Sequence, residues 1–225
     1  MEVSATPCAR TRQAYGSLHL NPRLKALIFD LDGTLVDSRL DFAAMRHELR
    51  APAGIGLLEY VETLATEEAQ QSAMDVIHKH EVAGAMAATW TATAEEAIHS
   101  LHAQGTPIAI VTRNNRHAAT LTMERLNMPP IPLKAREDAA PKPDPEALLA
   151  IAGEWRIHPK HCAYIGDFRY DIEAAERAGM LPVLYHPMGE RPPVFDGAPG
   201  ALRTLSDFRE LTGWCTGQSD QRGES

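Results

Sequence analysis

The chain has 225 residues, of which 44% are hydrophobic and 23% charged, and its formal net charge is −8. This composition is typical of a soluble globular protein with one domain, or with a core domain and a smaller insert. The acidic balance argues against a nucleic acid or an anionic membrane surface as the main partner, and we expect neither.

The cysteines and the apolar stretches indicate the cellular compartment of the protein. Cys8, Cys162 and Cys215 lie far apart and form no metal-ligand spacing, which favours a reduced, cytoplasmic protein. We see no apolar run near the roughly 18 residues that a membrane span needs. Residues 1–21 lack the apolar core of a secretory signal, so we expect a poorly ordered N-terminal arm. We expect a monomer.

Short apolar runs alternate with helical segments along the chain. We expect strands at residues 25–31, 107–112, 162–166 and 181–185, and helices near 39–50, 57–88, 93–104, 115–126, 144–152 and 171–178. Strands that alternate with helices indicate βαβ units, right-handed crossovers and a parallel sheet, hence an α/β fold.

Residues 39–90 differ from this alternation because they are rich in Ala, Glu, His and Met and have helical spacing throughout. We expect them to form a helical insert, and core segments at 22–38 and 91–211. Thr93 and Glu96 have the spacing of a capping box at the start of the next helix. The Gly/Ser/Gln-rich segment 212–225 is predicted to be a disordered tail.

Polar residues follow three of the predicted strands. Parallel sheets bind ligands at the carboxyl ends of their strands, so we expect these side chains to share one edge. They are Asp30 and Asp32 after the first strand, Thr112, Arg113 and Asn114 after the second, and Asp167 after the third, with Lys142 in the connection before it.

Carboxylates at separate strand ends are suited to Mg²⁺, which prefers oxygen ligands and commonly engages one or two carboxylates plus a substrate phosphate. Asp30, Asp32 and Asp167 supply such oxygens. One aspartate can attack phosphorus, and a second with a raised pKa can hold a proton for the leaving oxygen. Thr112 and Lys142 can bind the phosphoryl oxygens.

Four segments in this order, DLDGTLVDS, IVTRNN, PKPDP and IGDFRYD, resemble the four motifs of the haloacid dehalogenase superfamily, and most closely its phosphatases of the phosphoglycolate phosphatase type. The resemblance covers nearly all of residues 22–210. It implies a Rossmann-like core with a small helical cap between the first two motifs, where residues 39–90 lie.

The same resemblance implies roles for individual residues. Asp30 matches the nucleophile and Asp32 the general acid/base. The matches to the phosphate-binding positions are Thr112 and Lys142. Asp167 matches the metal ligand, and Asp171 a second acid that supports the metal site.

The position after the motif threonine is less typical, because related phosphatases often have a shorter polar residue where this chain has Arg113. We interpret Arg113 and Asn114 as candidate substrate-binding residues, with a surface position for Arg113 as the alternative. Residues 78–81, HKHE, invite a metal site, but their adjacent spacing favours a solvated helix face. Arg46 and Arg50, four residues apart on one helix face, are likewise expected on a solvated face, with contact to an anionic substrate as the alternative.

The predicted function is therefore magnesium-dependent hydrolysis of a small phosphorylated metabolite through an aspartyl-phosphate. A phosphosugar mutase that uses the same two aspartates is an alternative. A haloacid dehalogenase is disfavoured, because that chemistry needs no acid/base at Asp32. A non-catalytic phospho-acceptor module is disfavoured by the length and the insert. We also expect residues 39–90 to close over the core, with hinges near Val36–Arg39 and Thr89–Thr93.

Overall fold

A computed structural model describes residues 24–188 and 203–215. The expected arm at 1–21 and residues 216–225 of the expected tail lie outside the described residues. The main sheet contains β1 (Ala26–Phe29), β4 (Ile108–Val111), β5 (Leu133–Lys134), β6 (Cys162–Gly166), β7 (Leu181–Tyr185) and β8 (Arg203–Leu205). Its flanking helices are α4 (Ala94–Ala103), α5 (Arg116–Arg125), α6 (Glu146–Trp155), α7 (Arg169–Ala178) and α8 (Thr212–Cys215), with short 3₁₀ turns at Pro159–His161 and Phe208–Leu211.

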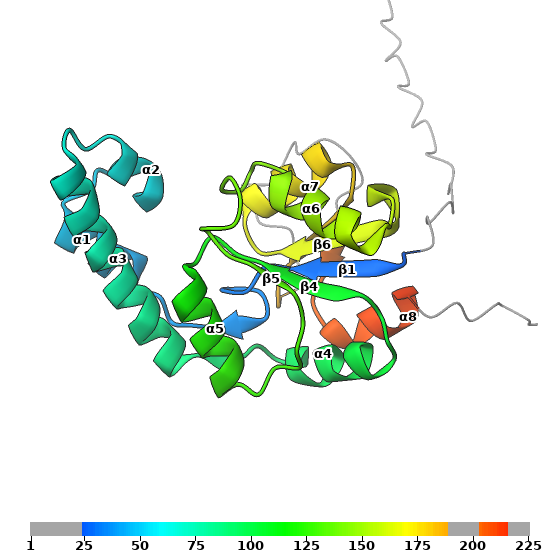
Figure 1. Ribbon diagram of the computed structural model, residues 1–225. Helices are drawn as coiled ribbons and strands as arrows, with labels where there is room; N and C mark the ends of the chain where they lie inside the picture. Colours follow the sequence, from blue (N-terminus) through cyan, green and yellow to red (C-terminus); the bar gives the residue numbers. More distant parts are fainter. Residues whose placement is uncertain (1–23, 189–202, 216–225) are drawn as a thin grey trace, which may run out of the picture.

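The six strands run in the order β5-β4-β1-β6-β7-β8 and every neighbouring pair is parallel. Figure 1 shows α6 and α7 on one face of this sheet and α4 and α8 on the other. This three-layer arrangement confirms the predicted Rossmann-like α/β core.

The sheet is buried on both faces, as its continuous apolar strands predict. In β1, Leu27 and Phe29 pack in the cluster with α4, whereas Ala26 and Ile28 pack in the cluster with α6 and α7. Successive strand residues point to opposite faces, so the run ALIF supplies both clusters at once. The central strand that leads to Asp30 is therefore held rigidly.

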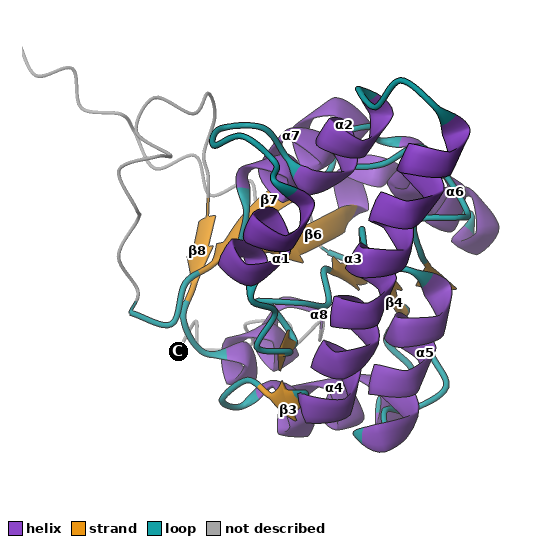
Figure 2. Cartoon of the chain, turned by 90° about the vertical axis from the view of Figure 1, so that its left-hand side faces the viewer, coloured by secondary structure: helices purple, strands orange, loops and turns teal. Residues whose placement is uncertain are grey.

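Residues 39–90, called the cap segment below, contain α1 (Phe42–Leu49), α2 (Leu57–Glu62) and α3 (Glu67–Ala87). The strands point their carboxyl ends toward these helices (Figure 1). The chain crosses into and out of the cap segment through β2 (Val36–Asp37) and β3 (Thr89–Trp90), which pair antiparallel with each other. Helix α3 lies beside α5 of the core (Figure 2).

The structure corrects several local expectations. Thr93 forms no capping box because its backbone is left-handed (φ 64°), and its hydroxyl accepts a hydrogen bond from Phe208 N instead. Helix α6 continues through Gly153 to Trp155 and ends at the left-handed Arg156. Residues 212–215 are helix α8 rather than tail, because Trp214 and Cys215 pack against the core. Among the described residues, no helix is long and apolar enough to cross a membrane.

Candidate active site

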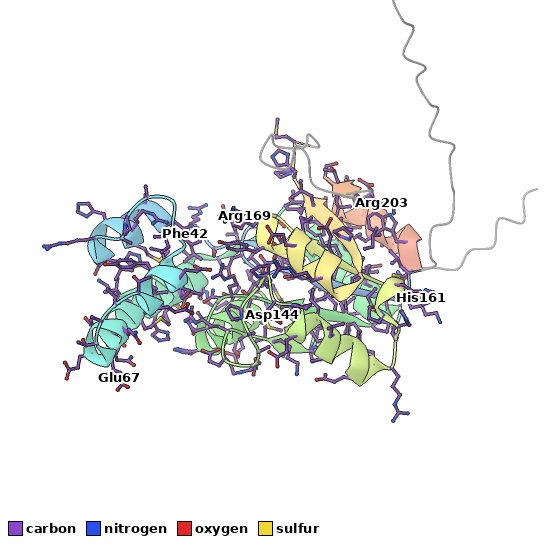
Figure 3. The ribbon with its side chains drawn as sticks, turned by 90° about the horizontal axis from the view of Figure 1, so that it is seen from above. Phe42, Glu67, Asp144, His161, Arg169 and Arg203 are labelled. Carbon is purple, nitrogen blue, oxygen red and sulfur yellow. The ribbon has the colours of Figure 1, made fainter. Side chains whose placement is uncertain are left out.

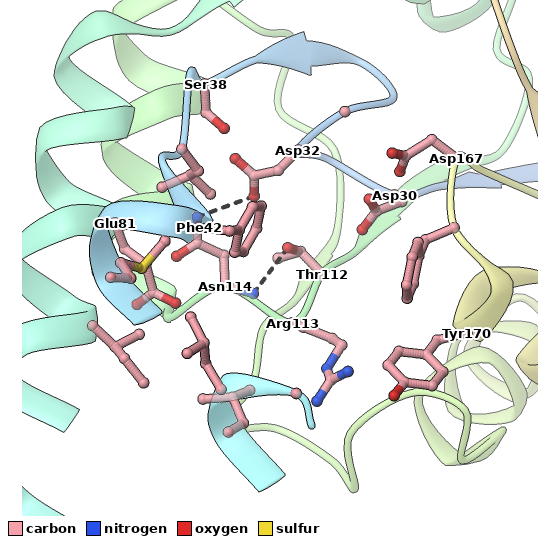
Figure 4. Close-up of a pocket in the computed structure, with 18 of the residues that line it drawn as sticks. Asp30, Asp32, Ser38, Phe42, Glu81, Thr112, Arg113, Asn114, Asp167 and Tyr170 are labelled. Carbon is pink, nitrogen blue, oxygen red and sulfur yellow. Dashed lines mark hydrogen bonds between the residues drawn. The ribbon is translucent and has the colours of Figure 1, made fainter. Parts of the chain in front are cut away.

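The carboxyl edge of the sheet brings the predicted strand-end residues together. Asp30 follows β1, Thr112 follows β4 and Asp167 follows β6, and all three line one cavity of about 550 Å³ between the sheet and the cap segment. Asp30 and Thr112 are buried. Figure 4 shows the Asp30 and Asp167 carboxylates facing each other on one side of this cavity.

Lys142 lies at the base of the cavity and is buried among acceptors. Its Nζ lies 2.6 Å from Asp30 Oδ1, 2.6 Å from Asp171 Oδ1 and 2.8 Å from the Tyr164 hydroxyl. The Tyr164 hydroxyl donates in turn to the Val111 carbonyl at 3.0 Å. Each of the three ammonium protons therefore has an acceptor, and the lysine is fixed in place.

Burial and neighbouring charge determine the protonation of these groups. Burial raises the pKa of Asp30 well above its ordinary value against the opposing effect of Lys142, and Asp171 raises it further. Burial also raises the pKa of Asp167, with Asp171, to about 6. For Lys142, burial alone would lower the pKa, but Asp171 and Asp30 outweigh it and raise the pKa. Lys142 is therefore charged at neutral pH.

The acidic groups form a cluster that fits a hard cation. Carboxylate oxygens of Asp30, Asp167 and Asp171 lie within 4.8 Å of one another, and Lys142 is the one buried lysine in the described part of the chain. A divalent cation would balance the remaining negative charge, and an all-oxygen donor set suits Mg²⁺. Burial first and the neighbouring Asp171 second raise the pKa of Asp167, and a bound cation would oppose both effects, so the site fits a divalent metal.

Two glycines of the motifs make room for these carboxylates. A Cβ on Gly33 (φ 82°) would lie 2.4 Å from Asp167 Oδ2, and a Cβ on Gly166 would lie 2.3 Å from Asp171 Cγ. Asp171 Oδ2 accepts a hydrogen bond from Phe168 N, while Oδ1 faces Lys142. Asp171 thus caps α7 and holds the lysine at the same time.

The Asp32 carboxylate lies outside the cluster of Asp30, Asp167 and Asp171, and its expected part in the metal site stays a prediction. Asp32 follows β1 in a turn, and its carboxylate is turned toward Asn114 (Figure 4). Oδ2 accepts from Asn114 Nδ2 at 3.1 Å, and Oδ1 is buried without a hydrogen-bond partner. Burial raises its pKa against the opposing effects of Ser38 and Asn114. The protonated form of Asp32 is therefore favoured more than that of an ordinary aspartate.

Thr112 and Arg113 occupy different parts of the cavity. The Thr112 oxygen accepts from Asn114 N at 3.0 Å, which leaves its hydroxyl proton for a ligand. Arg113 donates to Glu59 Oε1 of α2 at 2.5 Å and stacks on the Tyr170 ring, 4.8 Å from its centroid. Arg113 is thus neither free nor at the surface, because it joins the cap segment to α7 across the cavity.

The cap segment supplies a mostly apolar wall to the cavity. Arg46, expected on a solvated face, also lines it and donates to the Pro52 carbonyl. Figure 3 places Phe42 on the cap segment, opposite Arg169 of α7. The apolar lining residues from the cap segment are Leu40, Phe42, Met45, Leu57, Leu58 and Ile77.

One residue of the cavity was misassigned by sequence reasoning. Glu81 is not on a solvated face: it is 6% exposed, pairs with Arg136, and accepts from Asn115 Nδ2. Its spacing from Ile77 and Ala85, four residues on either side, places it on the buried stripe of α3. This helical periodicity in the sequence could have indicated that Glu81 is buried.

Comparison with known proteins agrees with this geometry. The family model of the haloacid dehalogenase-like hydrolases matches residues 24–179. A haloacid dehalogenase-like hydrolase domain-containing protein of Arabidopsis thaliana is 27% identical, over 86% of this chain and 83% of its own. A phosphoglycolate phosphatase of Rhodobacter capsulatus is 28% identical, over 84% and 95% respectively.

Comparison of the fold with solved structures gives relatives of the same kind. A solved hydrolase structure from Pseudomonas syringae superimposes with a TM-score of 0.69 at 25% identity and covers 84% of this chain and 96% of its own. The family model spans about two thirds of the chain and includes all four motifs. The predicted resemblance is confirmed, and the chain belongs to the haloacid dehalogenase-like hydrolase family.

Proposed function

We propose that this hydrolase is a magnesium-dependent phosphatase that removes the phosphoryl group from a small phosphorylated metabolite through an aspartyl-phosphate on Asp30. The observation that carries the proposal is the pairing of Asp30 with the buried, charged Lys142 at 2.6 Å, at the base of a cavity closed by the cap segment. The charge of Lys142 favours the ionised form of the nucleophile and opposes burial, which raises the pKa of Asp30.

In the first step, a carboxylate oxygen of Asp30 bonds to phosphorus while the bond from phosphorus to the leaving oxygen breaks. Asp32, protonated as its raised pKa favours, gives its proton to that oxygen. In the second step, the Asp32 carboxylate takes a proton from the water that attacks phosphorus. Inorganic phosphate leaves and Asp30 is restored.

We propose that the Thr112 hydroxyl and the Lys142 ammonium bind phosphoryl oxygens, for which Lys142 turns one of its three protons from its present acceptor to the phosphoryl group. We propose that Asp30 and Asp167 hold Mg²⁺, with Asp171 supporting the site from behind through Lys142 and the start of α7. When bound, the ion offsets the negative charge of the carboxylates and of the phosphoryl group. Lys142 and Mg²⁺ together allow an anionic substrate to approach in a protein of net charge −8.

The substrate class follows from the cavity and the relatives. Two curated relatives at 26% and 28% identity are named N-acetylmuramic acid 6-phosphate phosphatase and phosphoglycolate phosphatase, which supports a phosphorylated small molecule here. We propose that the core binds the phosphoryl group and the cap segment contacts the leaving group. We also propose that the protein is cytoplasmic and monomeric.

The test is phosphate release from a panel of phosphomonoesters and from 4-nitrophenyl phosphate, with Mg²⁺ and with EDTA. Repeated turnover that needs Mg²⁺ and is lost in Asp30→Asn is the expected result. Isomerisation of a phosphosugar without release of phosphate would instead favour the mutase. No reaction with any phosphomonoester in the presence of Mg²⁺ would refute the proposal.

A further inference from the structure

A chain of side-chain hydrogen bonds runs from the cap segment to Asp32. Asn115 Nδ2 donates to Glu81 Oε2 of α3 and, at 3.4 Å, to Asn114 Oδ1. Asn114 Nδ2 donates to Asp32 Oδ2 at 3.1 Å. These hydrogen bonds therefore connect the buried Glu81 carboxylate with the half-buried Asp32 carboxylate through two amides. Glu81, Asn114 and Asp32 all border the cavity (Figure 4).

Each amide in this chain has only one orientation that satisfies its neighbours. Asn115 Oδ1 accepts from Ala118 N at 2.8 Å as the N-cap of α5, so its nitrogen must face Glu81. Asn114 Oδ1 accepts from Asn115 N at 2.8 Å, so its own nitrogen must face Asp32. The donor presented to Asp32 is thus oriented by backbone N–H groups of the core loop and α5, and Glu81 of the cap segment holds this loop through Asn115 and Arg136.

Glu81 is held from its other side by Arg136. The guanidinium donates to Glu81 Oε1 at 2.8 Å and Oε2 at 3.1 Å, and to the Arg113 carbonyl at 3.3 Å. Arg136 N also donates to the Asn114 carbonyl at 3.0 Å. Glu81 and Arg136 therefore fix the loop that carries Thr112 and Asn114.

A purely structural role explains this arrangement poorly. A buried ion pair seldom stabilises a fold more than apolar residues of the same size would, and the neighbours of Glu81 on its stripe, Ile77 and Ala85, are apolar. A fully satisfied buried polar network does, however, specify one geometry. In this protein, the network that contains Glu81, Asn115 and Asn114 determines the position of the Asp32 carboxylate.

We propose that Glu81 is a positioning residue, which acts from the cap segment through Asn115 and Asn114 to orient the Asp32 carboxylate toward the leaving oxygen. The inference rests on the proposed acid/base role of Asp32. It links the seating of α3 against the core to proton transfer, so that Asp32 is correctly oriented only when the cap segment is in place.

The test compares Glu81→Met with wild type on two substrates that differ in their need for a proton. An alkyl phosphate needs its leaving oxygen protonated, whereas 4-nitrophenyl phosphate releases a stable phenolate without one. For Glu81→Met, kcat/KM is expected to fall about tenfold or more further on the alkyl phosphate than on the aryl phosphate. A simple loss of packing would lower both values equally.

Two further variants separate positioning from stability. Glu81→Met with Arg136→Met removes the uncompensated guanidinium, so it should regain thermal stability while keeping the unequal loss. Glu48→Met is the matched control, because Glu48 pairs with His80 within the cap segment and does not reach the core loop. It should leave the ratio of the two kcat/KM values unchanged.

The side-chain amide signals of Asn114 in ¹⁵N–¹H spectra give a readout that does not need catalysis. They should shift or broaden in Glu81→Met and stay in place in Glu48→Met. Equal losses on both substrates, or unchanged Asn114 signals, would overturn this inference alone. A wild-type protein that hydrolyses neither phosphate would overturn the proposed function, and this inference with it.

Discussion

Lys142→Met is the substitution whose effect the structure defines most closely. Methionine keeps the length of the side chain but removes the charge that lies 2.6 Å from both Asp30 and Asp171. The lysine side chain is 6% exposed, so water cannot replace it. Two buried carboxylates would then face each other without a counter-ion.

The expected loss of stability is large. Breaking a buried ion pair by removing one partner costs about 3–5 kcal/mol. In a protein of this size, each kcal/mol lowers Tm by about 2–4 °C, so the melting temperature without Mg²⁺ should fall by roughly 6–20 °C. Turnover should fall by a factor of about 10²–10³, because a donor to the transition-state charge is lost.

The loss should depend on pH in a defined direction. Without the lysine, the pKa of Asp30 in the folded protein rises further, so the folded state binds more protons than the unfolded state. Stability then increases as the pH falls, and the difference from wild type should shrink between pH 7 and pH 5.

Calorimetry or circular dichroism melts with EDTA measure the stability, and phosphate release measures the activity. Lys134→Met is the control, because Lys134 forms a more exposed pair with Glu154 at 2.8 Å, which is expected to contribute less than about 1 kcal/mol. Lys142→Met with Asp171→Asn should regain stability without regaining activity. A Tm for Lys142→Met no lower than that of Lys134→Met would refute the reasoning.

Three further outcomes are expected. Asp30→Asn should abolish phosphate release yet keep or raise the Tm measured with EDTA, because it removes a carboxylate whose pKa burial raises and leaves Lys142 paired with Asp171; trapping a phosphoenzyme on another residue would contradict this. Since the pKa of Asp167 is raised to about 6, the metal-free protein should lose stability as the pH rises from about 4 to 6, and Asp167→Asn should flatten that slope in thermal melts. Arg113→Ala should raise KM by about tenfold and Glu59→Ala should raise it less, since the guanidinium remains; unchanged steady-state kinetics in Arg113→Ala would exclude a contact with substrate.

The sequence predicted the elements that local pattern determines. Strands at 162–166 and 181–185 match β6 and β7 residue for residue, because continuous apolar runs bounded by polar residues mark a doubly buried strand. Strands β5 and β8 were not predicted. They have only two and three residues and lie at the two edges of the sheet, where their flanking sequence carries no long apolar run.

The same division applies to the candidate site. Strand-end motifs were sufficient to place Asp30, Thr112 and Asp167 at one edge, because the carboxyl ends of parallel strands share it. The direction of the Asp32 side chain depends on the turn after β1, and the roles of Glu59 and Glu81 depend on how the cap segment docks. Contacts between distant segments have no signature in a local pattern.

Those two contacts also limit how the cap segment can move. Glu81 is buried and tied to Arg136 and Asn115, and α3 packs along α5, so opening there would expose an ion pair and a helix interface. The tie between Glu59 and Arg113 is a single hydrogen-bonded pair whose side chains are 37% and 21% exposed. Breaking it requires little new exposure. We therefore expect opening to begin with loss of the Glu59–Arg113 pair, with α2 and α3 still packed together, so that substrate enters while Asp32 keeps its orientation.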